Sequence, residues 1–101
     1  MFKLKPDATF PATVQIPNGD APLPLKLVFR RKSKEDVSAW IDSVPTKSDP
    51  ESLKEIIETW TDVDAPYSED ALKELLSAYT GAGMAIFNGY LKALTEAERK
   101  N

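Results

Sequence analysis

The sequence predicts an α+β fold that is mainly helical, with an N-terminal antiparallel β-hairpin packed on about four α-helices. The first third of the chain alternates apolar and polar residues with period 2, which is typical of strands. The remainder repeats apolar residues at helical spacing, and capping and turn residues separate these segments. A length of 101 residues is that of one domain, so we expect a single domain over residues 1–101.

The hairpin is expected over residues 8–31. Asn18 and Gly19 form a strong turn dipeptide between its strands, because both residues tolerate positive φ. Pro11 and Pro24 cannot donate ladder hydrogen bonds, so each must face outward or lie at a bulge. The hairpin has one apolar face, which must pack on another element. Its apolar positions are Phe10, Ala12, Val14 and Ile16, followed by Leu23, Leu25, Leu27 and Phe29.

Four helices are expected after the hairpin, over residues 34–44, 49–61, 68–79 and 82–99. Serine or aspartate residues that can cap a helix precede or begin the first three ranges. Apolar residues within the ranges recur at i, i+3, i+4 and i+7. In the second range this stripe consists of Leu53, Ile56, Ile57 and Trp60. We interpret Trp40 and Trp60 as core anchors of the first two helices rather than as a clamp for a ligand ring.

The last predicted helix carries more apolar surface than one neighbour can cover. Its central stripe contains small residues four positions apart, which allow a neighbouring backbone to approach closely: Ala85, Gly89 and Ala93. Three larger side chains lie off the centre of this stripe: Met84, Phe87 and Leu91. They are candidates for a protein-binding face. The alternative, that the hairpin covers them, stays open.

The composition offers little for chemistry. The chain has no cysteine and no histidine, which excludes disulfides and removes the commonest general base and transition-metal ligand. Asp62 and Asp64 lack the loop glycine of a calcium site, and Gly81 and Gly83 lack the strand and lysine of a phosphate loop. We therefore expect no catalytic residues, no cofactor, no metal site and no enzymatic activity.

The net charge of -3 argues against nucleic-acid binding, which needs a basic surface. The basic cluster Arg30, Arg31, Lys32 and Lys34 is interpreted as a solvated strand end and loop. No stretch approaches the roughly 20 apolar residues of a membrane span, and the N-terminus has no signal-peptide pattern. We expect a cytoplasmic protein that binds neither nucleic acid nor membranes.

Several segments resemble the tail assembly chaperones of long-tailed bacteriophages and prophages. Residues 60–72 contain a tryptophan, an acidic loop, an aromatic residue, a serine cap and a leucine-bearing helix in the order seen in that family. Residues 75–82 resemble the family's aromatic-proline-glycine-alanine helix break, with Thr80 where proline is usual. Residues 85–94 and the closing 99–101 match its C-terminal pattern. The resemblance covers nearly the whole chain.

This resemblance implies a function. Such proteins bind the long, helical, aggregation-prone tape measure protein and promote assembly of the tail tube around it. They act in the cytoplasm of the bacterial host and are expected to be absent from the mature virion. In related families a frameshifted longer form recruits tail tube protein, so a tail tube partner is expected only for such a form.

Two other non-enzymatic functions stay open. A structural tail or connector protein retained in the virion would be found in purified particles. A small regulatory protein-binding domain would be encoded away from the tail genes. No particular oligomeric state is predicted by the sequence.

Overall fold

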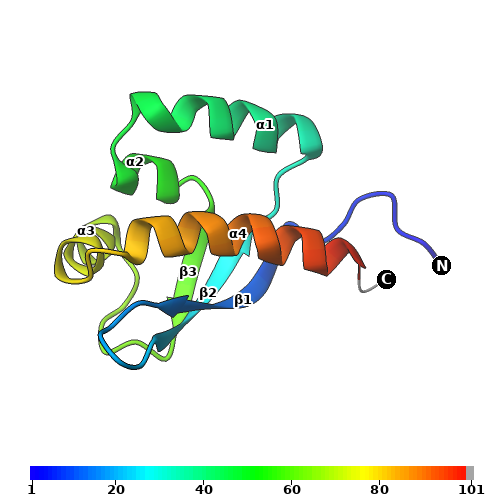
Figure 1. Cartoon of the computed structure of the whole chain (residues 1–101). Coiled ribbons are helices and arrows are strands. Elements are labelled where there is room, and N and C mark those ends of the chain that lie inside the picture. Colours follow the sequence, from blue (N-terminus) through cyan, green and yellow to red (C-terminus); the bar gives the residue numbers. More distant parts are fainter. Residues whose placement is uncertain (100–101) are drawn as a thin grey trace.

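The computed structural model describes residues 1–99, and the strands and helices are ordered β1 (Thr9–Ile16), β2 (Leu23–Arg30), α1 (Lys34–Ser43), the 3-10 helix η1 (Val44–Thr46), α2 (Asp49–Leu53), β3 (Ile57–Thr61), α3 (Glu69–Ala78) and α4 (Ala82–Arg99). The strands form one antiparallel sheet in the order β1-β2-β3. Helix α4 covers one face of this sheet, while α1 and α2 lie along one flank and α3 lies at one end (Figure 1). The expected α+β class and the N-terminal hairpin are confirmed.

The hairpin register places apolar residues opposite one another. Phe10 pairs with Phe29, and the same face continues through the other inward residues of both strands. Pro11 pairs with Val28 on the outward face. Because Pro11 has no N–H, this pair must be one of those without ladder hydrogen bonds, so the Pro11 nitrogen points to the free edge of β1.

The core lies between the sheet and α4, and Tyr90 of α4 lies at its centre. The Tyr90 ring is fully buried, with centroids 6.2 Å from the ring of Phe10 and 5.0 Å from that of Phe29. Its hydroxyl donates a hydrogen bond of 2.8 Å to the carbonyl of Arg30. Tyr90 therefore joins α4 to both strands of the hairpin, through packing and through one polar contact.

The small residues of α4 allow the close approach that the sequence predicts. A Cβ added at Gly89 would lie 2.8 Å from Cγ2 of Val14, closer than side-chain atoms approach in practice. Glycine at this position therefore sets the distance between α4 and β1. An open groove of about 280 Å³ borders this contact, with Lys92 and Glu96 on its rim.

The helix predicted over residues 49–61 is wrong beyond Leu53. Helix α2 ends there, and Ile57–Thr61 form strand β3 instead. The start of the helix is as expected, because Ser48 caps it by accepting a hydrogen bond from the Glu51 N–H at 3.4 Å. The segment that follows is rich in β-branched and aromatic residues, which favour a strand where the edge of β2 is available for pairing.

A β-bulge explains why β3 has the apolar spacing of a helix. Ile57 and Trp60 lie three residues apart, so a regular strand would place them on opposite faces. Here Ile57 pairs with Phe29 and Trp60 with Leu27, with a register shift between them that makes Glu58 an extra residue. Both large side chains consequently enter the core. Trp60 is a core residue as predicted, but it belongs to a strand.

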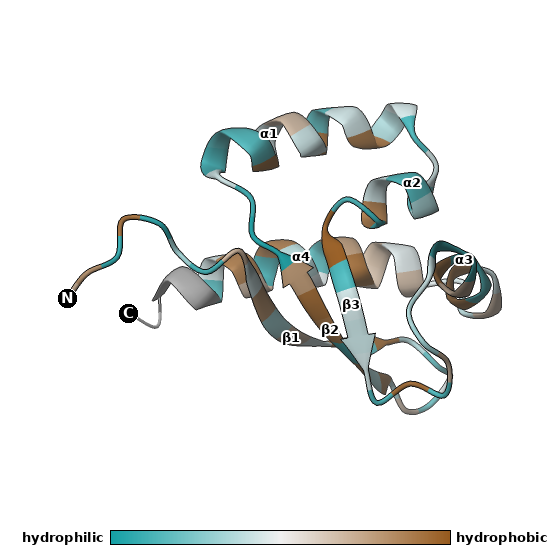
Figure 2. Ribbon diagram, turned by 180° about the vertical axis from the view of Figure 1, so that it is seen from behind, coloured by the Kyte–Doolittle hydropathy of each residue, from teal (hydrophilic) through white to brown (hydrophobic). Residues whose placement is uncertain are grey.

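The opposite face of the sheet carries no helix within residues 1–99, as the view from behind shows (Figure 2). Two ion pairs connect β2 to β3 and the loop that follows it: Arg30 to Glu58 at 2.9 Å and Lys26 to Asp62 at 3.5 Å. All four side chains are exposed to solvent, so these pairs add little to stability. The polar character of this face agrees with its exposure.

Candidate protein-binding site

Met84, Phe87 and Leu91 form a continuous strip on α4, called the α4 strip below. They are neighbours because a helix rotates by about 100° per residue, which places positions three and four apart side by side. Met84 is 67% exposed, whereas Phe87 and Leu91 are half-buried and pack against the core. The structure thus brings the three predicted residues together, but leaves only one of them open to solvent.

Helix α1 covers the middle of the α4 strip. The indole ring of Trp40 stacks on Phe87 with centroids 5.2 Å apart and an interplanar angle of 26°. The same indole meets Tyr90 edge-on at 5.5 Å. For Phe87, the covering element is therefore α1, not the hairpin that the sequence left open as an alternative.

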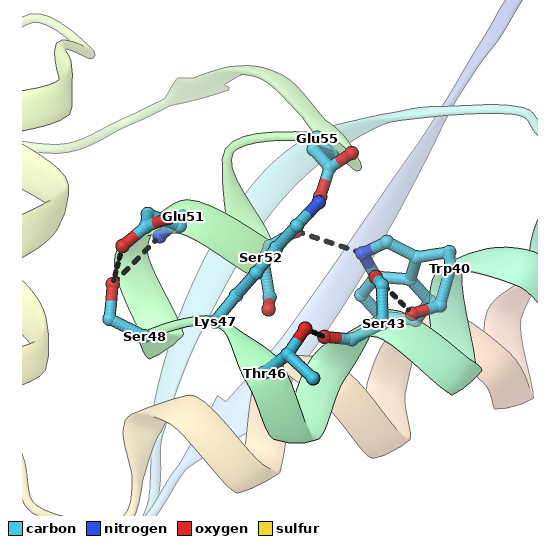
Figure 3. A network of polar contacts seen from close by, with 8 residues as sticks. All are labelled: Trp40, Ser43, Thr46, Lys47, Ser48, Glu51, Ser52 and Glu55. Carbon is cyan, nitrogen blue, oxygen red and sulfur yellow. Dashed lines mark hydrogen bonds and ion pairs between the residues drawn. The ribbon is translucent and has the colours of Figure 1, made fainter.

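Polar contacts fix the position of Trp40 (Figure 3). Its Nε1 donates a buried hydrogen bond of 2.9 Å to the carbonyl of Ser52 in α2. The hydroxyl of Ser43 donates to the carbonyl of Trp40 at 2.7 Å. The buried hydroxyl of Ser52 has no hydrogen-bond partner among the described residues. The Trp40 side chain therefore links α1 to α2 by a hydrogen bond and to α4 by stacking.

Trp60 of β3 is also buried, and its side chain contacts the loop before α3. Its Nε1 donates to the carbonyl of Ala65 at 2.8 Å, and its ring meets Tyr67 edge-on at 5.1 Å. Burial raises the pKa of the Tyr67 phenol, as it does that of Tyr90. These contacts hold the loop before α3 against the sheet, and they leave neither tryptophan available as a ligand clamp.

Asp62, one of the two loop carboxylates considered for a calcium site, forms an exposed ion pair with Lys26 at 3.5 Å. Asp62 has a left-handed backbone conformation, with φ of 58°, in the turn that follows β3. No group of three or more potential metal ligands is found among the described residues. Within residues 1–99, no helix has both the length and the apolar character needed to cross a membrane.

Sequence reasoning did not single out the apolar residues of the N-terminal segment. Phe2 and Leu4 are 82% and 91% exposed, on either side of Lys3. Their period-2 alternation was a signal that could have drawn attention to them. The cover that α1 provides over the α4 strip was also missed, because no local pattern indicates which helices pack together.

A family model described as phage tail assembly chaperone matches residues 1–101. The chain belongs to the phage tail assembly chaperone family. Comparisons with curated proteins and with solved structures give no match. The family match includes the residue 60–72 segment that carries the resemblance noted in the sequence. As a member of this family, the protein is assigned to the assembly of phage tails.

Proposed function

We propose that the protein binds the tape measure protein and promotes assembly of the tail tube around it, without catalysis. The match of the whole chain to a tail assembly chaperone family carries this proposal. The exposed end of the α4 strip supports it, because Met84 is a large apolar side chain that the fold leaves 67% exposed. A chain that keeps an apolar client soluble needs apolar surface of its own.

Met84→Glu is the sharpest test of the α4 strip. Met84 is exposed, so a carboxylate there is solvated and leaves the fold intact, whereas a charge at Phe87 would also disturb Trp40. We expect recovery of co-expressed tape measure protein with the tagged variant to fall at least about tenfold, which corresponds to about 1.4 kcal/mol of binding free energy.

Ser77→Glu provides the matched control, because it adds the same charge at an exposed helical position on α3. Its recovery of tape measure protein should equal that of the wild type, and both variants should keep the wild-type circular dichroism spectrum. Equal recovery with both variants would show that the α4 strip is not the binding surface. Failure of the wild-type protein to recover tape measure protein would contradict the proposed function itself.

The protein is further proposed to act in the cytoplasm of the bacterial host and to leave before the virion is complete. Mass spectrometry of purified particles is the test, and the expected result is absence of the chain. A stoichiometric amount in particles would instead assign it as a structural tail or connector protein. A tail tube partner is proposed only for a longer frameshifted product, which immunoblotting of infected cells would detect.

A further inference from the structure

Helix α1 is attached to the rest of the molecule through a single buried side chain. Trp40 is 3% exposed and is the only residue of α1 that is buried. Val37 is half-buried, and Ile41 is 38% exposed although it lies on the apolar side of the helix. Elements that bury so little apolar surface occupy the low-stability end of a fold.

The backbone hydrogen bonds of α1 are satisfied within its own segment. Ser33 caps the helix by accepting from the N–H of Asp36 at 3.1 Å, and the N–H of Val44 closes the C-terminal end on Ile41. No strand of the sheet pairs with this segment. Helix α1 can therefore leave its position without breaking the sheet, and the Ser52 carbonyl that loses the Trp40 donor still accepts from the N–H of Glu55 at 3.3 Å.

Removal of α1 would uncover a defined socket. The floor of this socket is the face of the Phe87 ring and the edge of Tyr90, which Trp40 now covers. The carbonyl of Ser52 is the acceptor that Trp40 Nε1 now uses. Met84 continues the apolar surface of the socket on the same flank of α4. The socket thus accepts a flat aromatic ring that carries one N–H donor.

We propose that α1 is a displaceable cover, and that the socket beneath it receives an amphipathic helix of the client with an aromatic anchor. The occupant follows from what the socket already holds, since α1 is itself a capped amphipathic helix anchored by one indole. The inference rests on the proposed function in one respect, which is that the client is a tail protein. The displacement of α1 is a property of the isolated chain.

Hydrogen exchange of the wild-type protein tests the displacement. The amides of α1 are expected to exchange at least about 100-fold faster than those of β2 and α4, because a ten-residue helix that has left its packing site is too short to stay folded in water. The rates of α1 should also depend less steeply on denaturant than those of β2 and α4, because the opening of α1 exposes the socket but much less surface than global unfolding does. Protection of α1 equal to that of β2 and α4 would overturn the proposal.

A peptide supplied in trans tests the socket and its preferred occupant. The probe is a fluorescein-labelled synthetic peptide of residues 33–48, and the receptor is the full chain carrying Trp40→Ala. This receptor should bind the peptide at least about tenfold more tightly than the wild type does, because the internal competitor no longer holds the socket. The same peptide carrying Trp40→Ala should bind neither receptor.

Lack of peptide binding by a folded Trp40→Ala receptor, or equal binding by both receptors, would overturn the proposal. If Trp40→Ala fails to fold, the receptor is replaced by Trp40→Phe, which keeps an aromatic ring but loses the hydrogen bond to Ser52 and part of the stacked ring area. No tail protein is present in these experiments, so a negative result would contradict the displacement of α1 and leave the proposed function untouched. Loss of co-purification with tape measure protein concerns the proposed function alone.

Discussion

Two glycines of α4 show how packing decides the effect of a single residue. Gly89→Ala should lower the free energy of unfolding by about 1 to 3 kcal/mol, because its Cβ would lie 2.8 Å from the branched and rotationally restricted side chain of Val14. Denaturation in urea measures this change. Val14→Ala in the same chain should recover part of the Gly89→Ala loss, since it removes the clashing methyl groups.

Gly83→Ala is the matched control in the same helix. Its Cβ would meet Oδ2 of Asp49 at 2.5 Å, but that carboxylate ends an exposed side chain that can rotate away. The gain in helix propensity then offsets the cost of moving the Asp49 carboxylate. The free energy of unfolding should therefore stay within about 0.5 kcal/mol of the wild-type value. Equal losses for the two glycine substitutions would contradict the claim that contact with Val14 is what requires glycine at position 89.

Two serines near Trp40 are expected to make opposite contributions to the free energy of unfolding. Ser52→Ala should be neutral or raise the free energy of unfolding by up to about 1 kcal/mol, because its buried hydroxyl has no hydrogen-bond partner in the part of the chain that the structure describes. Ser43→Ala should lower it by about 1 kcal/mol, because its hydroxyl donates to the Trp40 carbonyl at 2.7 Å. Urea denaturation of both variants distinguishes them, and a loss at Ser52 equal to that at Ser43 would reveal an unrecognised partner for the Ser52 hydroxyl.

Among the elements, strand β3 contains a bulge whose extra residue is Glu58. Deletion of Glu58 would place Ile57 and Trp60 two residues apart, so a regular strand would keep both side chains in the core and in their present register with β2. We expect the deletion variant to fold with a loss of less than about 2 kcal/mol, measured by circular dichroism and denaturation. Glu58→Gln is the control, because it removes only an exposed ion pair with Arg30 and should cost less than about 1 kcal/mol. Loss of the folded state on deletion would contradict the assignment of Glu58 as the extra residue.

The elements also show what sequence pattern can predict and where it stops. The hairpin follows from alternation and from the Asn18-Gly19 turn, and α3 follows from its Ser68 cap and apolar period. Strand β3 was missed because its bulge gives Ile57 and Trp60 a helical spacing. A bulge depends on the partner strand, so the local sequence of β3 contains no separate signal for it.

At the level of the whole molecule, the candidate site was predictable only in part. Helical spacing placed Met84, Phe87 and Leu91 together on α4, and the structure confirms that they are neighbours. Their exposure depends on α1, whose Trp40 is distant in sequence from Phe87. Which helices pack together is a property of the complete fold, and the spacing of apolar residues within one helix does not encode it.

The stability of the whole molecule should fall at alkaline pH through Tyr90. Burial raises the pKa of its phenol above the unfolded value near 10, although the backbone at Lys32 and the charge of Arg31 oppose this shift. The stabilising effect of the protonated phenol is complete below pH 10 and is lost as the pH rises through the raised folded pKa. Denaturation between pH 8 and 11 should therefore show decreasing stability.

Tyr90→Phe isolates this effect. The variant loses the hydrogen bond to the Arg30 carbonyl and should be less stable than the wild type at pH 8. It should also lose less stability than the wild type between pH 8 and 11, because one buried phenol no longer ionises. Tyr67 titrates in both proteins and cancels in the comparison. Parallel losses would show that Tyr90 does not control the alkaline transition.

The two edge strands of the sheet, β1 and β3, are poor templates for pairing with a strand of another protein. Pro11 removes a donor from the outer side of β1, and the extra residue Glu58 disrupts the regular spacing of donors and acceptors along β3. A strand of another protein could thus not form an uninterrupted row of backbone hydrogen bonds along either edge. For a member of a tail assembly chaperone family, this arrangement disfavours the addition of strands from other proteins to its own sheet.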